Sequence, residues 1–248
     1  MARRRHGRVI YGRRGDLVSL DLDLPTGRLD EGVHADLVRV CGEIDLDSSV
    51  RTVTLRNRRA VFCRGDSPEV RVDGPDGVAA VAALRVPTLA VLGGDALDAG
   101  LELAMACDLR IARAGVKLGL TQALEGQIPF HGGTQHLPRL VGPSRAARML
   151  LLGEVLPARR ALDAGLVQAV VPAQRLATEV RAWERALASR GPQAQKYAKE
   201  ALRAAADVPL AEGLRLEGDL YVLLETTKDR REGVEAFRDG RKPRFEGK

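Results

Sequence analysis

Residues 93–108 read Gly-Gly-Asp-Ala-Leu-Asp-Ala-Gly-Leu-Glu-Leu-Ala-Met-Ala-Cys-Asp, and their pattern of small and apolar residues is the most informative in the chain. The segment before it, Thr88–Leu92, is apolar and bounded by Pro87 and by the Gly93-Gly94 turn, a pattern typical of a buried strand. The small residues that follow predict a loop opening into a helix. Because the first N–H groups of a helix have no intrahelical acceptor, such a loop stabilises negative charge.

A second glycine-containing turn has the sequence Phe62-Cys63-Arg64-Gly65-Asp66 and follows another short apolar segment. A parallel sheet brings the turns at the carboxyl ends of its strands to one edge. We therefore expect the two turns to converge. Their backbone N–H groups would then form an oxyanion hole, which holds a carbonyl oxygen as it gains negative charge.

Outward from these turns, strand-like and helix-like segments alternate in the first half of the chain. We expect strands at Leu17–Leu24, Val53–Leu55, Val61–Phe62 and Thr88–Leu92, and helices at Val33–Ile44 and Gly77–Leu84. Strands separated by helices imply parallel pairing through right-handed crossovers. The chain therefore begins as an α/β core.

From about Pro143 the pattern becomes mainly helical. Ser144 is expected to cap a helix at Arg145–Leu152, Pro157 opens another helix, and Val167–Val171 is the last candidate strand. Four amphipathic segments complete the chain, at Ala173–Ser189, Pro192–Ala206, Leu210–Lys228 and Asp229–Arg238. We expect an α/β core over residues 1–190 and a helical C-terminal region over residues 191–248.

The composition of the 248 residues excludes several classes of protein. The three cysteines are too few for a disulfide framework, no metal site is indicated, and apolar runs such as Pro87–Gly93 are too short to span a membrane. Aromatic residues make up 3%, so stacking platforms for nucleic acid are nearly absent despite a net charge of +6. We expect a soluble cytoplasmic protein, and its excess of arginine suits a phosphorylated, anionic ligand.

Several motifs occur in a fixed order along the chain. They are Phe62-Cys63-Arg64-Gly65-Asp66, Glu102–Ala112, Gly126-Gln127-Ile128-Pro129, Gly132-Gly133-Thr134-Gln135, Leu137–Gly142, Ala161–Val167, and Asp229-Arg230-Arg231-Glu232-Gly233 with Phe237. With these motifs the chain resembles the enoyl-CoA hydratase/isomerase (crotonase) superfamily from about Leu17 to Phe245. The resemblance implies the α/β crotonase-like (ClpP/crotonase) fold, a spiral of ββα units. It also implies a homotrimer or homohexamer, in which the C-terminal helices serve oligomerisation and active-site capping.

The resemblance assigns roles to four positions. Arg64 and Ala99 match the two oxyanion donors, although the family's run of three glycines here reads Asp98-Ala99-Gly100. Glu102 matches one of the two catalytic carboxylates of the family's hydratases, and the second position holds Gln122. An amide does not exchange a proton near neutral pH, so Glu102 is expected to be the single retained acid/base.

Other residues near these motifs have a functional and a structural alternative. His131 titrates in a range that suits proton transfer, or it is a structural histidine. Phe130 is expected to narrow the water side of the pocket, and Glu125 to be a solvated surface charge. Asp66 is expected to bond its own backbone within the turn, and Asp98 to cap the following helix. The candidates for substrate and CoA binding are Arg28, Cys63, Asp66, Phe130, Phe237, Arg241 and Lys242.

The resemblance implies a lyase of the enoyl-CoA hydratase or dehydratase kind, acting on an acyl-CoA or an acyl-carrier-protein thioester without a tightly bound cofactor. The short segment between Asp66 and Pro87 favours an acyl group other than a straight fatty chain. Two alternatives stay open because of Gln122 and Asp98-Ala99-Gly100. One is an acyl-thioester-binding accessory protein without catalysis, and the other is a decarboxylase or thioester hydrolase of the same fold.

Overall fold

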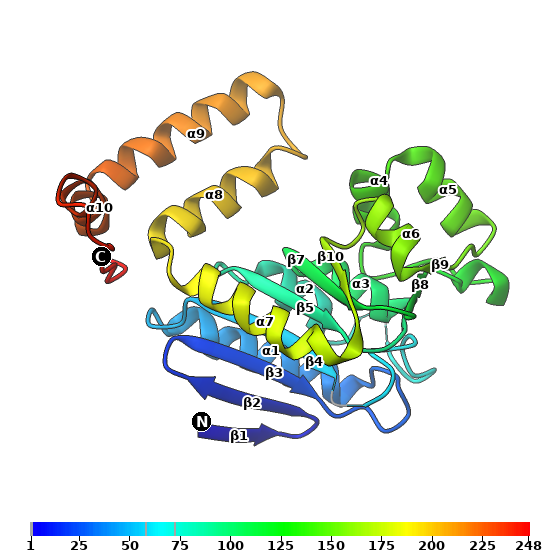
Figure 1. Ribbon diagram of the computed structural model, residues 1–248. Coiled ribbons are helices and arrows are strands. Elements are labelled where there is room, and N and C mark those ends of the chain that lie inside the picture. The colour runs from blue at the N-terminus through cyan, green and yellow to red at the C-terminus, as the bar shows by residue number, and fades with distance from the viewer. Residues whose placement is uncertain (1, 58, 72) are drawn as a thin grey trace.

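A seven-stranded sheet forms the centre of the molecule, with the strands in the order β1-β2-β3-β4-β5-β7-β10 (Figure 1). The computed structural model describes residues 2–57, 59–71 and 73–248. The strands are β1 (Ala2–His6), β2 (Val9–Arg14), β3 (Leu17–Leu22), β4 (Thr52–Asn57), β5 (Thr88–Leu92), β7 (Leu109–Arg113) and β10 (Ala169–Val171).

Strands β3, β4, β5, β7 and β10 pair in parallel, which confirms the pairing expected from the sequence. The antiparallel hairpins that join β1, β2 and β3 were not expected. Their turns hold Gly7 and Gly15, both with positive φ, as tight hairpin turns require. The arginine-rich edge strand β1 lacks the apolar alternation by which a strand is recognised.

Helices cover both faces of this sheet. The helices of the described residues are α1 (Glu31–Leu46), α2 (Gly77–Ala83), α3 (Ala99–Ala106), α4 (Gly133–Val141), α5 (Pro143–Leu151), α6 (Ala158–Asp163), α7 (Ala173–Ala188), α8 (Pro192–Ala204), α9 (Leu210–Glu225) and α10 (Lys228–Arg238). The main core joins α1, α2 and α3 to one face of the sheet, for example through Leu37 and Leu55. On the other face, Val180 of α7 packs with Leu89 and Ile111.

A second, small sheet brings the start of α3 beside later segments. It contains β6 (Ala96–Leu97), β8 (Lys117–Gly119) and β9 (Leu156–Pro157), and a 3₁₀ turn, η1 (Gln122–Glu125), follows β8. The strand expected at Val61–Phe62 is wrong, because these two residues form a bend and only the next residue, Cys63, makes an isolated bridge, with Ala96. The expected cap Ser144 is also wrong, because α5 begins at Pro143.

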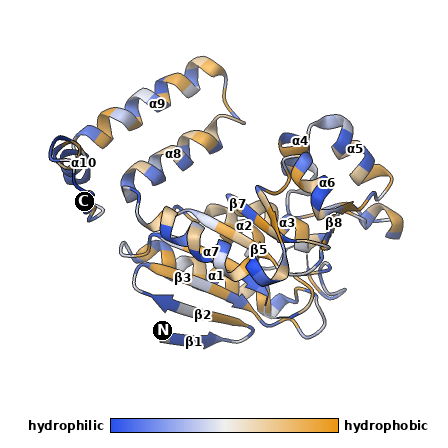
Figure 2. Cartoon of the chain, in the orientation of Figure 1, coloured by the Kyte–Doolittle hydropathy of each residue, from blue (hydrophilic) through white to orange (hydrophobic). Residues whose placement is uncertain are grey.

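Helices α8, α9 and α10 extend away from the sheet (Figure 1). Lys199 fastens α8 to the core, because its Nζ donates to Asp108 Oδ2 at 2.5 Å and to the Val86 carbonyl at 2.7 Å. Apolar residues recur along the projecting helices (Figure 2), and those exposed include Leu202, Leu210, Leu214, Tyr221, Val222 and Phe237.

The boundary at residue 190 between an α/β core and a helical C-terminal region stays a prediction. Among the described residues, none of the helices is long and apolar enough to cross a bilayer.

Candidate active site

The turns at residues 62–66 and 93–100 touch, as the sequence predicts. The Leu97 N–H donates to the Cys63 carbonyl at 2.9 Å, and Cys63 forms a parallel bridge with Ala96. A Cβ on Gly100 would lie 2.2 Å from the Cys63 carbonyl oxygen, closer than any side chain permits. Glycine at position 100 therefore allows the backbones of the two turns to approach each other.

The two expected oxyanion donors differ in their surroundings. Ala99 is buried and is the first residue of α3, so its N–H has no acceptor within the helix, nor any backbone acceptor elsewhere in the described ranges. The Arg64 N–H donates to the Gly27 carbonyl at 2.7 Å. A thioester oxygen would therefore find the Ala99 donor available and would have to replace Gly27 at the Arg64 donor.

Asp98 precedes Ala99 in a strained backbone conformation. Its φ of 51° is the only positive value among the described non-glycine residues, and such a conformation costs about 1–3 kcal/mol. Asp98 is the N-cap residue of α3, as the sequence predicts, but its carboxylate makes no hydrogen bond to the first turn of the helix. It accepts instead from the backbone N–H and the hydroxyl of Thr121, at 2.6 and 2.9 Å. These bonds hold the turn in place.

Glu102 lies on α3 with 1% of its surface exposed. Its Oε1 accepts the backbone N–H groups of His131 and Gly133, both at 2.8 Å, and its Oε2 accepts Nε2 of Gln122 at 3.2 Å. Burial raises the pKa of this carboxyl group above its ordinary value, although the two backbone donors oppose that effect. A carboxyl group poised in this way can accept and return a proton near neutral pH.

Gln122, on η1, approaches Glu102 through its amide nitrogen. Its amide oxygen, Oε1, is buried and has no hydrogen-bond partner among the described residues. A buried acceptor without a partner costs free energy unless a ligand or a water molecule bonds to it. Glu102 and Gln122 therefore present one proton acceptor and one open amide oxygen side by side.

The ring of His131 lies between two carboxylates. Its Nε2 is 3.0 Å from Asp66 Oδ2 and its Nδ1 is 3.1 Å from Asp76 Oδ1, while only 1% of the side chain is exposed. Burial alone would lower the pKa of His131, but the hydrogen bonds to Asp66 and Asp76 outweigh it and raise the pKa to about 10. The pairing also lowers the pKa of Asp66, and that of Asp76 to about 2, against their own burial.

Sequence reasoning missed two members of this cluster, His34 and Asp76. His34 is fully buried on α1, its Nε2 lies 3.2 Å from Asp66 Oδ1, and its ring stacks on His131 with centroids 5.0 Å apart. A histidine within the apolar face of a helix was the available signal. The expectation that Asp66 bonds its own backbone is wrong, since its carboxylate bonds the two histidines.

The remaining candidates near the turns have these positions. Nη1 of Arg28 donates to the Asp66 carbonyl at 2.8 Å. The Cys63 thiol is buried, and desolvation raises its pKa to about 12, so it is not a reactive thiolate. Phe130 is 46% exposed and meets the His131 ring edge-on, with centroids 4.9 Å apart. Glu125 is exposed, in agreement with its expected surface position.

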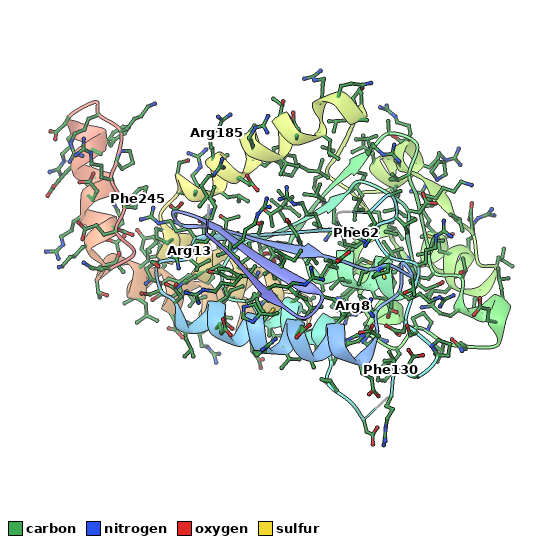
Figure 3. The ribbon with its side chains drawn as sticks, turned by 90° about the horizontal axis from the view of Figure 1, so that it is seen from below. Arg8, Arg13, Phe62, Phe130, Arg185 and Phe245 are labelled. Atoms are coloured by element: carbon green, nitrogen blue, oxygen red, sulfur yellow. The ribbon has the colours of Figure 1, made fainter. Side chains whose placement is uncertain are left out.

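The C-terminal candidates lie at the opposite end of the molecule from this site. Figure 1 places α10 far from α3, and Figure 3 shows Phe245 on the left of the molecule, with Phe62 and Phe130 both in its right half. Phe237 is 88% exposed, and Arg241 pairs with Glu232 through two hydrogen bonds at 2.6 and 2.9 Å. Within one chain the fold does not bring Phe237, Arg241 or Lys242 to Glu102.

Comparison with known proteins identifies relatives over nearly the whole chain. Residues 17–248 match the family model described as Enoyl-CoA hydratase/isomerase. The chain is 33% identical to 2,3-dehydroadipyl-CoA hydratase of Escherichia coli (strain K12), over 97% of this chain and 99% of the relative. It is also 33% identical to (E)-benzylidenesuccinyl-CoA hydratase of Thauera aromatica, over 93% and 94% of the two chains.

Solved structures agree with these sequence matches. A crystal structure of an enoyl-CoA hydratase from Bacillus anthracis superposes with a TM-score of 0.90 at 32% identity, covering 97% of this chain and 100% of the other. The α/β crotonase fold expected from the sequence is thereby confirmed. With a family model over residues 17–248 and full-length relatives above 30% identity, the chain belongs to the enoyl-CoA hydratase/isomerase (crotonase) family of CoA-thioester-processing enzymes.

Proposed function

We propose that this protein is an enoyl-CoA hydratase, or the reverse dehydratase, in which Glu102 is the only acid/base. The observation that carries the proposal is the pairing of Glu102 with Gln122, whose buried amide oxygen has no partner among the described residues. A water molecule between them would donate one hydrogen to Glu102 and the other to this amide oxygen. Its oxygen would then be oriented toward the β-carbon of the substrate.

The reaction needs no second carboxylate if Glu102 acts twice. Glu102 removes a proton from water as the water oxygen bonds to the β-carbon, and the thioester becomes an enolate. The same carboxyl group then returns the proton to the α-carbon, so that H and OH have been added across the double bond. The buried environment that raises the pKa of Glu102 assists the uptake of the proton.

The enolate oxygen needs donors that are fixed in advance. We propose the Ala99 N–H as the first donor, and the Arg64 N–H as the second after the substrate oxygen has displaced the Gly27 carbonyl. Removing one such donor typically costs about 10²–10³ in rate. The Asp98 turn and the glycine at position 100 keep the Ala99 donor next to the Arg64 turn.

We assign the CoA part of the substrate from charge and exposure. Arg28 lies at the Asp66 turn, and the exposed Arg64 guanidinium has no ion pair or hydrogen bond in the described part of the chain, so both can meet phosphate. Cys63 and Asp66 would contribute backbone contacts, and Phe130 would border the acyl group. We propose that Phe237, Arg241 and Lys242 serve the site of a neighbouring protomer in a cytoplasmic homotrimer or homohexamer without a tightly bound cofactor.

Kinetics on a panel of enoyl- and 3-hydroxyacyl-CoA esters test the proposal. We expect turnover of at least one ester, and a loss of about 100-fold or more in kcat for Glu102→Gln, because the amide accepts the same backbone bonds but no proton. Glu125→Gln is the matched control, since Glu125 is exposed and its loss should leave kcat unchanged. Full activity of Glu102→Gln, or no turnover of any ester, would contradict the proposal.

The alternative function is acyl-thioester binding without chemistry. It is favoured by the amide at position 122 and by the engaged Arg64 N–H. Calorimetry with the same CoA esters separates the two: binding without turnover supports an accessory protein. Release of CO₂ from a malonyl-type ester, or of free CoA from an acyl ester, would instead identify a decarboxylase or a thioester hydrolase.

A further inference from the structure

A network of four titratable side chains, two buried histidines and two partly buried aspartates, lies beside the Glu102–Gln122 pair. His34 comes from α1, Asp66 from the turn at residues 62–66, Asp76 from the N-cap of α2, and His131 from the loop before α4. Neither the proposed reaction nor the CoA contacts use these four side chains together. Side chains from three other segments thus converge on the imidazole ring of His131.

The hydrogen bonds define the protonation state of each ring. The Gly77 N–H donates to His34 Nδ1 at 3.0 Å, so this nitrogen carries no proton, and His34 Nε2–H donates to Asp66 in a neutral ring. Both nitrogens of His131 face carboxylate oxygens, which only accept hydrogen bonds. His131 must therefore donate from both nitrogens, which makes it an imidazolium ion.

A metal ion is the alternative occupant, because two histidines and an aspartate also form the ligand set of many metal sites. A histidine that binds a metal through Nε2 donates its Nδ1–H to a second group. At His34 that nitrogen faces another donor, the Gly77 N–H. The geometry around His34 therefore favours a network held by protons.

His131 also connects the turn at residues 62–66 to the loop that bonds the Glu102 carboxylate. Its ring binds Asp66, two residues after the Arg64 donor, while its own backbone N–H and that of Gly133 hold Glu102 Oε1. The second carboxylate, Asp76, fixes the ring to α2, where it also accepts the Val78 and Ala79 N–H groups. A rotation of the ring would thus disturb both the oxyanion turn and the loop that holds Glu102.

We propose that His131 is a positioning residue: a permanent imidazolium, held by Asp66 and Asp76, that fastens the Glu102-binding loop to the oxyanion turn and favours the ionised form of Glu102. The proposal rests on Glu102 being the acid/base. The titratable groups that contact the ring are Asp66, Asp76 and neutral His34. The carboxylate of Glu102 bonds the backbone N–H of His131, and Arg28 adds a positive charge at the Asp66 carbonyl.

The role differs from proton transfer in its chemistry. Both N–H groups of the ring are already donated, the side chain is 1% exposed, and its pKa of about 10 keeps the proton in place at neutral pH. The positive ring lowers the pKa of Glu102 by its charge, opposing the effects of burial and of Asp66. Without the imidazolium, Glu102 should therefore hold its proton at higher pH.

Nitrogen NMR of the histidine rings tests the charge directly. In protein labelled with ¹⁵N-histidine, we expect one of the four rings to show two protonated nitrogens without titrating between pH 6 and 9. That signal should vanish in His131→Gln and persist in His136→Gln, a control in the exposed part of α4. A neutral His131 at pH 7, or ring shifts that change on addition of Zn²⁺ alone, would overturn the proposal.

Carbon NMR of the side-chain carboxyl groups tests the influence on Glu102. With the Glu102 signal assigned through Glu102→Gln, we expect its pKa to rise by about one unit or more in His131→Gln and to be unchanged in His136→Gln. If the pKa of Glu102 were unchanged in a folded His131→Gln protein, the charge of His131 would not act on Glu102. That result would contradict the proposal and leave His131 with a structural role alone. Neither measurement requires turnover, so its outcome is independent of whether an enoyl-CoA ester is hydrated.

Asp76→Asn keeps the proposal testable if His131→Gln does not fold. Asparagine caps helices as well as aspartate does, so α2 should persist while the imidazolium loses one of its two carboxylates. We expect the His131 ring to begin titrating below pH 9. Asp73→Asn is the matched control, because Asp73 is exposed and pairs only with Arg71 among the described residues. No change in His131 titration in Asp76→Asn would contradict the proposal.

Discussion

The amide nitrogen of Gln122 lies 3.2 Å from Oε2 of Glu102, so the position at which the resemblance places a second carboxylate instead donates a hydrogen bond to Glu102. A hydrogen bond donated to Glu102 favours its carboxylate form, which accepts a proton. It also means that restoring the carboxylate would place two acidic groups within hydrogen-bond distance. The chemistry of the site should therefore depend strongly on residue 122.

Gln122→Glu should change the pH dependence of catalysis. Two carboxyl groups at this distance share a proton, so the pKa values of the pair should separate, one rising well above the ordinary value. In a plot of kcat against pH, we expect the apparent pKa of the acidic side to move by about one pH unit or more. The profile is measured with the CoA ester of the panel that is turned over fastest. Gln127→Glu is the control, because Gln127 is exposed. Identical pH profiles for Gln122→Glu and the parent protein would show that residue 122 is not coupled to Glu102.

Gly100→Ala should destabilise the protein. Its Cβ would lie 2.2 Å from the Cys63 carbonyl oxygen, so the two turns would have to separate. We expect a loss of about 3 kcal/mol or more in the free energy of unfolding, measured with urea. Gly218→Ala, in α9 with nothing within 4 Å of the new Cβ, should instead be neutral or stabilising by up to about 1 kcal/mol. Equal effects of the two substitutions would argue against contact between the turns.

Asp98 should tolerate glycine better than alanine. Both substitutions lose the bonds to Thr121, but glycine adopts the φ of 51° without strain, whereas alanine does not. We expect Asp98→Ala to be less stable than Asp98→Gly by about 1 kcal/mol in urea unfolding. Because the two variants lose the same side-chain bonds, each controls for the other. An alanine variant as stable as the glycine variant would mean that the backbone of this turn relaxes.

The charged network should make stability depend on pH at both extremes. The pKa of His131 is raised to about 10, so its contribution is complete below pH 6.5 and is lost as the pH rises through about 10. The pKa of Asp76 is lowered to about 2, so its contribution is present above about pH 4 and is lost as the pH falls through about 2. Urea unfolding across this range should show the largest contribution of the network between about pH 4 and 6.5.

His131→Gln should flatten the alkaline part of that dependence, since the titrating group is gone. His136→Gln should leave it as it is, because His136 lies outside the network. If the parent protein and His131→Gln lost stability in parallel between pH 7 and 10, His131 would not be charged in the folded state.

Those parts of the fold that depend on local chemistry could be predicted from the residues alone. Small residues between a buried strand and a helix dictate the turn at residues 93–100, and alternating apolar patterns indicate β3, β5 and α1. The ordered motifs were sufficient to place Glu102 and Gln122 in one site. Short-range steric and hydrogen-bond preferences operate within a few residues, so they are visible in the sequence.

The pairing of the charged residues around that site, by contrast, depends on tertiary packing. Asp66 lies 32 residues from His34 and 65 from His131, and Asp76 lies 55 from His131. Such contacts leave no local pattern, because they depend on how α1, α2 and the loop before α4 pack. The hydrogen bond from the Arg64 N–H to the Gly27 carbonyl and the antiparallel β1–β2 hairpin could not be predicted from the sequence for the same reason. The sequence thus determined which groups are present, and packing decided which of them meet.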